Sequence, residues 1–147
     1  IKYLVVGLGE CEQEDQKLIQ GLGLKGQVVL AGYREDVDAL LQMADCFVFP
    51  SIQEGLPVSL MEAMAAGVPV VCSRIRGNTD LITDGVDGLL TGPMDEAGYA
   101  KAVLKLKKDP RLKELLLKNA KEKIKQFDMK RVHCKMLRVY QDCIDLN

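Results

Sequence analysis

Two glutamates lie on either side of a turn whose chemistry suits an anionic ligand. Glu54 lies in a loop, and Glu62 follows with seven residues between them, inside a helix that Pro57 is well suited to start. The unpaired amides of that first turn, those of Val58 and Ser59, could hold a diphosphate with help from the helix dipole. Each carboxylate could then accept hydrogen bonds from sugar hydroxyls, one set on a hexose and the other on a ribose. Taken alone, either glutamate is also an ordinary surface acid.

A second candidate is the glycine pair Gly7 and Gly9, which follows an apolar run like the first glycines of a dinucleotide-binding fingerprint. That fingerprint requires a small residue at the position where this sequence has Glu12. Glu14 and Asp15 add further negative charge. Acids at a helix start suit the helix dipole but oppose an anionic ligand, so we disfavour a nicotinamide-dependent dehydrogenase.

Metal-binding patterns are weak in this sequence. Asp36 and Asp38 could form a D-x-D magnesium site, but they stand at the start of the helical run DALLQMA, where acidic residues favour a helix N-terminus. We therefore prefer N-capping for this pair. His133 is the single histidine, which leaves little basis for a histidine zinc site or a Ser-His pair. No metal cofactor is expected.

The composition is that of a water-soluble globular chain. Its 147 residues are 48% apolar, and no stretch approaches the roughly 18 to 20 uninterrupted apolar residues of a membrane span. Five cysteines without any C-x-x-C spacing favour reduced thiols in the cytoplasm. Residues 1–98 carry 6 basic and 15 acidic side chains, whereas residues 99–147 carry 14 and 6. The basic part could meet an anionic membrane, although such helices are usually just solvated, and no nucleic-acid partner is expected.

Short apolar runs alternate with amphipathic segments along the chain. The runs lie at residues 1–7, 27–32, 45–51 and 68–73. They are rich in Val, Leu and Phe with little polar alternation, which is typical of parallel strands covered on both faces. Helices should fill the gaps, with one ending at Gly67, and from residue 95 onward we expect helices only, one of them opened by Pro110. The pattern predicts an α/β fold, a Rossmann-like parallel sheet flanked by helices and ending in helices.

The ordered motifs resemble the family 4 retaining glycosyltransferases of the GT-B architecture. Glu54 and Glu62 match the E-x7-E motif of that family. The segments GYREDVDALLQMADCFVFPS, MEAMAAGVPVVCS and IRGNTDLITDGVDGLL resemble its surroundings, so the resemblance covers nearly all of residues 3–92. It implies that residues 1–147 are the donor-binding domain, the C-terminal half of a longer two-domain enzyme.

By position, the resemblance also implies roles for the site residues. Glu54 would contact hydroxyls of the transferred sugar in a positioning and charge-stabilising catalytic role, and Glu62 would contact the ribose. The amides of Val58 and Ser59 would bind the diphosphate. Pro57 replaces the glycine of many relatives and removes one amide donor. Further matching positions are Gly55 and Leu56 beside the donor sugar, Tyr33 and Arg34 against the base, and Gly7 and Gly9 on the floor of the site.

The implied reaction is transfer of a hexose from a UDP- or GDP-sugar to an acceptor, with retention and without a metal. The wording RGNTDLI resembles enzymes of bacterial cell-surface polysaccharide synthesis. This suggests a cytoplasmic protein at the inner face of the membrane that acts on a lipid-linked acceptor, with Lys121, Lys123 and Lys125 as membrane contacts. Because the family's acceptor-binding N-terminal domain and its diphosphate-clamping strand and helix have no counterpart here, we expect the chain alone to be inactive. The alternatives are a GT-B-like nucleotide-sugar epimerase and a non-catalytic binding module.

Overall fold

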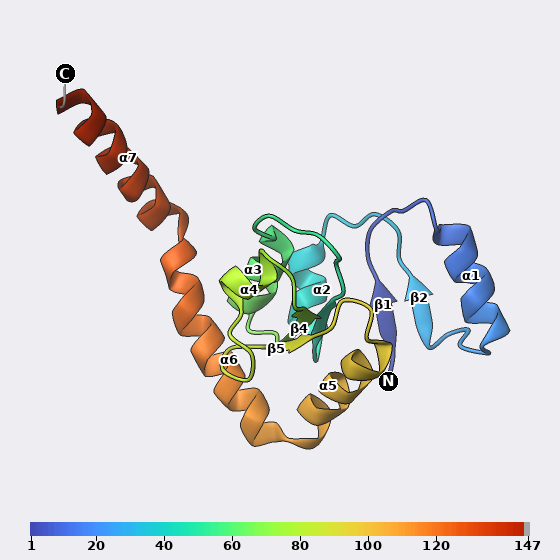
Figure 1. Cartoon of the computed structure of the whole chain (residues 1–147). Helices are drawn as coiled ribbons and strands as arrows, with labels where there is room; N and C mark the ends of the chain where they lie inside the picture. The colour runs from blue at the N-terminus through green and yellow to red at the C-terminus, as the bar shows by residue number, and fades with distance from the viewer. Residues whose placement is uncertain (146–147) are drawn as a thin grey trace. The chain divides into compact units, whose positions relative to one another are not determined.

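The computed structural model describes residues 1–145. The chain divides into two compact units, Ile1–Val37 and Asp38–Asn147, and both contain parallel strands and helices (Figure 1). Each of the four apolar runs forms a strand. This outcome confirms the predicted α/β class and the parallel pairing of its strands.

The first unit is a β-α-β arrangement. Strand β1 (Tyr3–Val5) pairs in parallel with β2 (Val28–Leu30), and helix α1 (Glu12–Gly21) lies between them in sequence. Glutamate and aspartate side chains occupy the first turn of α1, as the helix dipole favours. The connection after the helix returns the chain to the neighbouring strand, which is the standard use of a helix between parallel strands.

The second unit contains a three-stranded parallel sheet in the order β3-β4-β5. Its strands are β3 (Phe47–Phe49), β4 (Val70–Ser73) and β5 (Leu89–Thr91). Every residue of the central strand β4 is buried. The run Val70, Val71 and Cys72 in that strand follows from its position, because a central parallel strand is covered on both faces.

The helices of the chain after β2 account for the rest of the fold. They are α2 (Val37–Met43), α3 (Val58–Ala66), α4 (Asn78–Leu81), α5 (Glu96–Lys108), α6 (Pro110–Ile124), the 3-10 turn η1 (Lys125–Phe127) and α7 (Met129–Asp145). Helix α5 packs against β4 and β5, and α3 packs against β4 and α6. Helix α6 begins at Pro110, as predicted.

The core lies on both faces of β4. On one face, Val71 packs with Leu89, Leu106 and Leu116 from β5, α5 and α6. Val70 is the neighbouring strand residue, and its side chain therefore points to the opposite face. There a Cβ added to Gly88 would lie 2.7 Å from a methyl group of Val70, so position 88 has no room for a side chain next to this strand.

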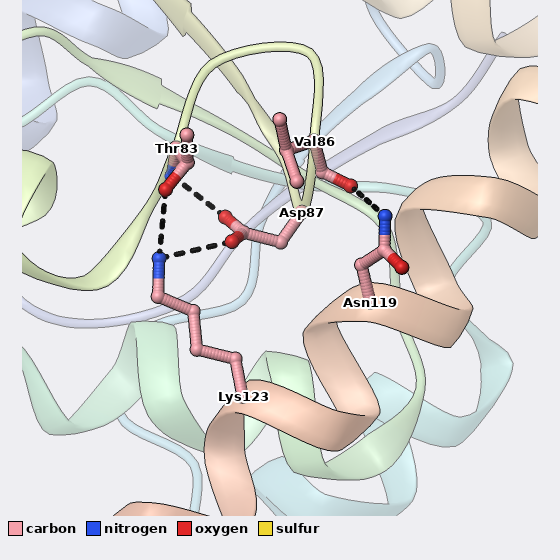
Figure 2. Close-up of polar contacts among 5 residues, drawn as sticks. All are labelled: Thr83, Val86, Asp87, Asn119 and Lys123. Atoms are coloured by element: carbon pink, nitrogen blue, oxygen red, sulfur yellow. Dashed lines mark hydrogen bonds and ion pairs between the residues drawn. The ribbon is translucent and has the colours of Figure 1, made fainter.

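A polar cluster of hydrogen bonds and one ion pair connects helix α6 to the turn before β5 (Figure 2). The Asp87 carboxylate accepts a hydrogen bond from the Thr83 amide at 2.7 Å and forms an ion pair with the Lys123 ammonium at 2.9 Å. Lys123 also donates to the Thr83 hydroxyl at 3.0 Å, and the Asn119 amide donates to the Val86 carbonyl at 2.8 Å. This cluster engages Lys123, one of the three lysines predicted to contact a membrane.

One strand was not expected from the sequence. Strand β5 adds a third strand to the sheet at a place where no strand was predicted. The helices expected from residue 95 onward are confirmed. The last of them, α7, continues the chain beyond α6 (Figure 1), and its described side chains, those of residues 129–144, are all exposed. The single histidine, His133, is among these exposed residues.

Candidate functional site

The loop after β3 leads directly into helix α3, and the start of this helix is uncapped. Pro57 is the N-cap residue, in an extended conformation at φ −74° and ψ 113°, and it makes no side-chain capping hydrogen bond. The first helical bond runs from the Met61 amide to the Pro57 carbonyl, at 3.3 Å. The amides of Val58 and Ser59 precede that bond, so intrahelical bonding leaves them available to an anion.

Helix α3 separates its buried face from the face that carries Glu62. Leu60, Ala63 and Met64 are fully buried, whereas Glu62 is exposed and the Val58 side chain is 61% exposed. Val58 and Glu62 are four residues apart and therefore neighbours on one helix face. The carboxylate thus lies on the solvent side, one turn from the uncapped helix start.

The predicted helix end is also confirmed. Gly67 adopts a left-handed conformation at φ 75°, and the Val68 amide donates to the Ala63 carbonyl at 2.9 Å. This is the arrangement with which a C-terminal glycine closes a helix. Local residue chemistry therefore defines both ends of α3, and with them the position of Glu62 relative to the loop.

The Glu54 loop packs closely against the chain that follows β4. Glu54 is partly buried, and Leu56 is 50% exposed. Gly77 has a positive φ of 87°, and a Cβ at this position would lie 2.5 Å from the Gly55 carbonyl oxygen and 2.8 Å from that of Glu54. Only glycine allows both the backbone angle and this approach.

A buried polar chain joins the same two segments. The Ser73 hydroxyl donates a short hydrogen bond to the Ser51 carbonyl, and it accepts one from the Asn78 side-chain amide at 2.9 Å. Asn78 also donates to the Ser73 carbonyl at 3.0 Å. Both Ser73 and Asn78 are fully buried. Sequence reasoning did not identify these residues, and its available signals were a serine at a strand end and the glycine–asparagine pair at 77 and 78.

In the first unit, Gly7 and Gly9 line a pocket of about 190 Å³. Gly7 has a φ of 126°, and its amide donates to the Gly32 carbonyl at 2.8 Å. Glu12 and Asp15 line the same pocket. Their negative charge agrees with the sequence-based argument against a diphosphate bound directly beside this glycine turn.

Tyr33 and Arg34 follow β2 in the first unit. The Tyr33 side chain is 69% exposed, and the Arg34 guanidinium binds the Asp36 carboxylate with hydrogen bonds of 2.8 and 2.6 Å. This hydrogen bonding lowers the pKa of Asp36 and raises that of Arg34. Asp36 directly precedes α2, the position expected of an N-terminal acid, but its described side-chain bonds go to Arg34. The first carboxylate of the D-x-D pattern, for which we prefer N-capping to magnesium binding, is thus paired with a cation.

Among the residues described, no three His, Cys, Asp or Glu side chains form a group that could hold a metal ion. In the same part of the chain, no helix has the length and apolar character needed to cross a bilayer. Two thiols are sequestered: burial raises the pKa of Cys46 and of Cys72 to about 12. These thiols therefore stay protonated and unreactive at neutral pH.

The predicted site residues fall into two sets. Glu54, Gly55, Leu56, Val58, Ser59 and Glu62 lie on one continuous loop and helix start in the second unit. Gly7, Gly9, Tyr33 and Arg34 belong to the first unit, at the ends of β1 and β2. The structure thus brings the first set together on α3 and its preceding loop, around an uncapped helix N-terminus.

Comparison with known proteins identifies the family to which this chain belongs. Residues 1–123 match the family described as "Glycosyl transferases group 1". The UDP-Gal:alpha-D-GlcNAc-diphosphoundecaprenol alpha-1,3-galactosyltransferase of Escherichia coli is 32% identical over 123 residues, which are 83% of this chain and 32% of that enzyme. The N,N'-diacetylbacillosaminyl-diphospho-undecaprenol alpha-1,3-N-acetylgalactosaminyltransferase of Campylobacter jejuni is 34% identical over 119 residues, 81% of this chain and 32% of the enzyme.

Solved structures agree with the sequence relatives. HepE from Anabaena in complex with UDP superposes with a TM-score of 0.91 at 26% identity, covering 97% of this chain and 41% of HepE. Its complex with UDP-glucose gives a TM-score of 0.89. The chain spans about a third of the length of the two curated relatives. On the match over residues 1–123 and these likenesses, the chain belongs to the group 1 glycosyl transferases, which have the GT-B fold.

Proposed function

We propose that the intact protein transfers a hexose from a nucleoside-diphosphate sugar to an acceptor with retention, in cell-surface polysaccharide synthesis. Residues 1–147 supply the donor-binding domain. One observation carries the proposal: the uncapped start of α3 lies on the same short segment as two carboxylates, Glu54 before it and Glu62 one turn into it. Amide donors suit the diphosphate, and carboxylates suit sugar hydroxyls.

Each group on this segment has a distinct role in the proposal. The amides of Val58 and Ser59 bind the diphosphate, and Glu62, exposed on the same helix face as Val58, accepts hydrogen bonds from the ribose. Glu54 accepts hydrogen bonds from hydroxyls of the transferred sugar. Gly55 and the half-exposed Leu56 lie in the loop beside that sugar.

The residues of the first unit enter the proposal by their match to the family motif. Tyr33 offers an exposed aromatic ring, on which a nucleobase can stack. Arg34 lies beside it, and its pairing with Asp36 restricts the guanidinium. Gly7 and Gly9 form the floor of the donor site, where the absence of side chains lets a ligand approach the backbone.

The proposed chemistry rests on electrostatic stabilisation of the leaving diphosphate. Negative charge develops on this group as the bond to the sugar breaks, and the positive end of the α3 dipole is oriented toward it in advance. The fixed dipole takes the role that a metal ion has in other transferases, so the reaction is proposed to be metal-independent. Glu54 positions the sugar and stabilises positive charge on it, without acting as a nucleophile.

The donor and the acceptor are proposed from the relatives. HepE was solved with UDP and with UDP-glucose, which favours a uridine nucleotide. Two relatives are named for diphosphoundecaprenol-linked substrates, which favours a lipid-linked acceptor and a peripheral location at the inner membrane face. Because Lys123 pairs with Asp87 and Lys125 pairs with Glu122, the exposed basic side chains of α7 are better candidates for membrane contact. They include Lys130, Arg131, Lys135 and Arg138.

A nucleotide titration of the chain, followed by amide NMR, tests the donor site. We expect UDP to shift the amides of residues 54–62 in a saturable way and Glu62→Ala to weaken binding by about tenfold, equal to the loss of about 1.4 kcal/mol. Glu114→Ala removes a similarly exposed helical glutamate from α6 and is the matched control. Equal affinities for the two variants, or shifts confined to other segments, would refute the assignment of Glu62.

Tests of retention and of metal independence require a transferase that contains this chain together with an acceptor-binding domain. We expect full transfer activity in the presence of EDTA, and a product whose anomeric proton coupling matches that of the donor. Loss of activity in EDTA that added magnesium restores would contradict the metal-independent mechanism, and inversion at the anomeric carbon would contradict retention.

A further inference from the structure

Segment 73–78, from the end of β4 into α4, makes two separate contacts with the loop that carries Glu54. At one end of the loop, the Ser73 hydroxyl donates to the Ser51 carbonyl. At the other end, Gly77 lies so close to the carbonyls of Glu54 and Gly55 that no side chain would fit. The loop between β3 and α3 is thus held on both sides of Gln53.

The polar contact has a fixed direction. The Asn78 amide nitrogen donates to the Ser73 hydroxyl at 2.9 Å, so that hydroxyl uses its own hydrogen for the Ser51 carbonyl. The same nitrogen donates to the Ser73 carbonyl at 3.0 Å. Asn78 therefore orients the serine hydroxyl toward the loop through two donors on one atom.

Asn78 would destabilise the fold if its side chain only filled space in the core. The residue is fully buried, and its Oδ1 atom has no hydrogen-bond partner among the described residues. A buried acceptor without a partner opposes folding, and an apolar residue of similar size would avoid that penalty. The useful part of this side chain is thus its amide nitrogen, which connects it to the Glu54 loop through Ser73.

We propose that segment 73–78 is a template for the conformation of the Glu54 loop, with Ser73, Gly77 and Asn78 as positioning residues for recognition of the donor sugar. The inference deepens the proposed function and rests on it, because Glu54 is the proposed sugar contact. The template acts on Glu54 and leaves the start of α3 unchanged, since Pro57 and the buried face of α3 define that helix independently. Changes in the template should therefore affect binding of the sugar more than binding of the nucleotide.

The first test examines the chain without a ligand. Ser73→Ala removes the hydroxyl that reaches Ser51, and Thr91→Val is its control. Thr91 is the register partner of Ser73 and also buried, but its hydroxyl donates to the Gly92 carbonyl. We expect amide shifts and faster hydrogen exchange in residues 51–56 for Ser73→Ala only. Equal changes in both variants, or an unchanged loop in Ser73→Ala, would overturn the inference.

The second test compares two glycines of the same unit. Gly77 and Gly85 have positive φ values of 87° and 72°, but a Cβ on Gly85 would meet nothing within 4 Å. Alanine therefore strains the backbone at both positions and displaces the Glu54 loop only at Gly77. We expect Gly77→Ala to weaken UDP-glucose binding by about tenfold more than Gly85→Ala, with UDP affinity similar in both. Equal loss of UDP and UDP-glucose would overturn the inference.

The two tests separate failure of the inference from failure of the proposed function. If the wild-type chain binds neither ligand, the donor-site proposal fails for this chain, and the ligand-free loop signature still decides whether segment 73–78 sets the loop conformation. If the wild type binds both ligands but Ser73→Ala leaves the loop unchanged and Gly77→Ala binds UDP-glucose as well as Gly85→Ala does, the proposed function stands and the template does not.

Discussion

The polar cluster between α6 and the turn before β5 gives a quantitative prediction. Asp87 is 5% exposed, and Lys123, whose side chain is 22% exposed, is its ion-pair partner at 2.9 Å. Lys123→Met keeps much of the side-chain volume but leaves the carboxylate buried without its cation. Breaking a buried pair in this way costs about 3–5 kcal/mol. Because Lys123 retains some contact with solvent, we expect roughly 2–3 kcal/mol in the free energy of unfolding.

Urea unfolding followed by far-UV circular dichroism measures this loss. Lys125→Met is the control, because Lys125 pairs with Glu122 at the surface, where the side chains are 58% and 68% exposed. Such an exposed pair contributes about 0–0.5 kcal/mol. In the double variant Asp87→Asn with Lys123→Met, we expect part of the stability to return, since the buried charge is gone. If Lys123→Met is no more destabilising than Lys125→Met, the reasoning is refuted.

Two further predictions concern titrating groups. Burial raises the pKa of the Asp84 carboxyl, but hydrogen bonds from the Leu90 amide and the Arg74 guanidinium lower it more, so the folded-state pKa lies below its usual value. The ionised Asp84 carboxylate stabilises the fold above its unfolded-state pKa, and this stabilisation is lost as the pH falls through the folded-state pKa. In Asp84→Asn the free energy of unfolding should therefore fall less steeply below about pH 4. An unchanged dependence of the free energy of unfolding on pH would contradict this. Because Cys46 and Cys72 have pKa values of about 12, a thiol reagent at pH 8 should spare both in the folded chain, and their rapid labelling would show that the core opens. Rapid labelling is expected at the exposed cysteines Cys11, Cys134 and Cys143.

Much of the fold was predictable because its signals are local. Pro57 and Gly67 define α3, since proline suits a helix start and a left-handed glycine closes the helix end. The apolar runs identified four strands, and β4, the central strand of its sheet, is buried along its whole length, as a parallel strand covered on both faces requires. The residues of the E-x7-E segment therefore appear where the sequence placed them, on one loop and one helix start.

The remainder depends on tertiary contacts that sequence spacing does not reveal. The apolar run of strand β5, Leu89 and Leu90, is shorter than the runs that identified the other four strands, and its parallel pairing with β4 is a tertiary contact. The bond from Ser73 to Ser51 joins residues 22 positions apart. Lys123 was predicted as a membrane contact because it lies in the basic C-terminal part of the chain, but the Asp87 carboxylate binds it. The pattern of charge along the chain predicts none of these pairings.

The most direct test of the donor-site assignment compares two ligands in two variants. The affinities of UDP and UDP-glucose would be measured by calorimetry for the wild type, Glu54→Gln and Glu62→Gln. If Glu62 contacts the ribose and Glu54 the sugar, Glu62→Gln weakens both ligands by about tenfold, whereas Glu54→Gln weakens only UDP-glucose. Unchanged affinities in both variants, or weaker UDP binding in Glu54→Gln, would contradict the assignment.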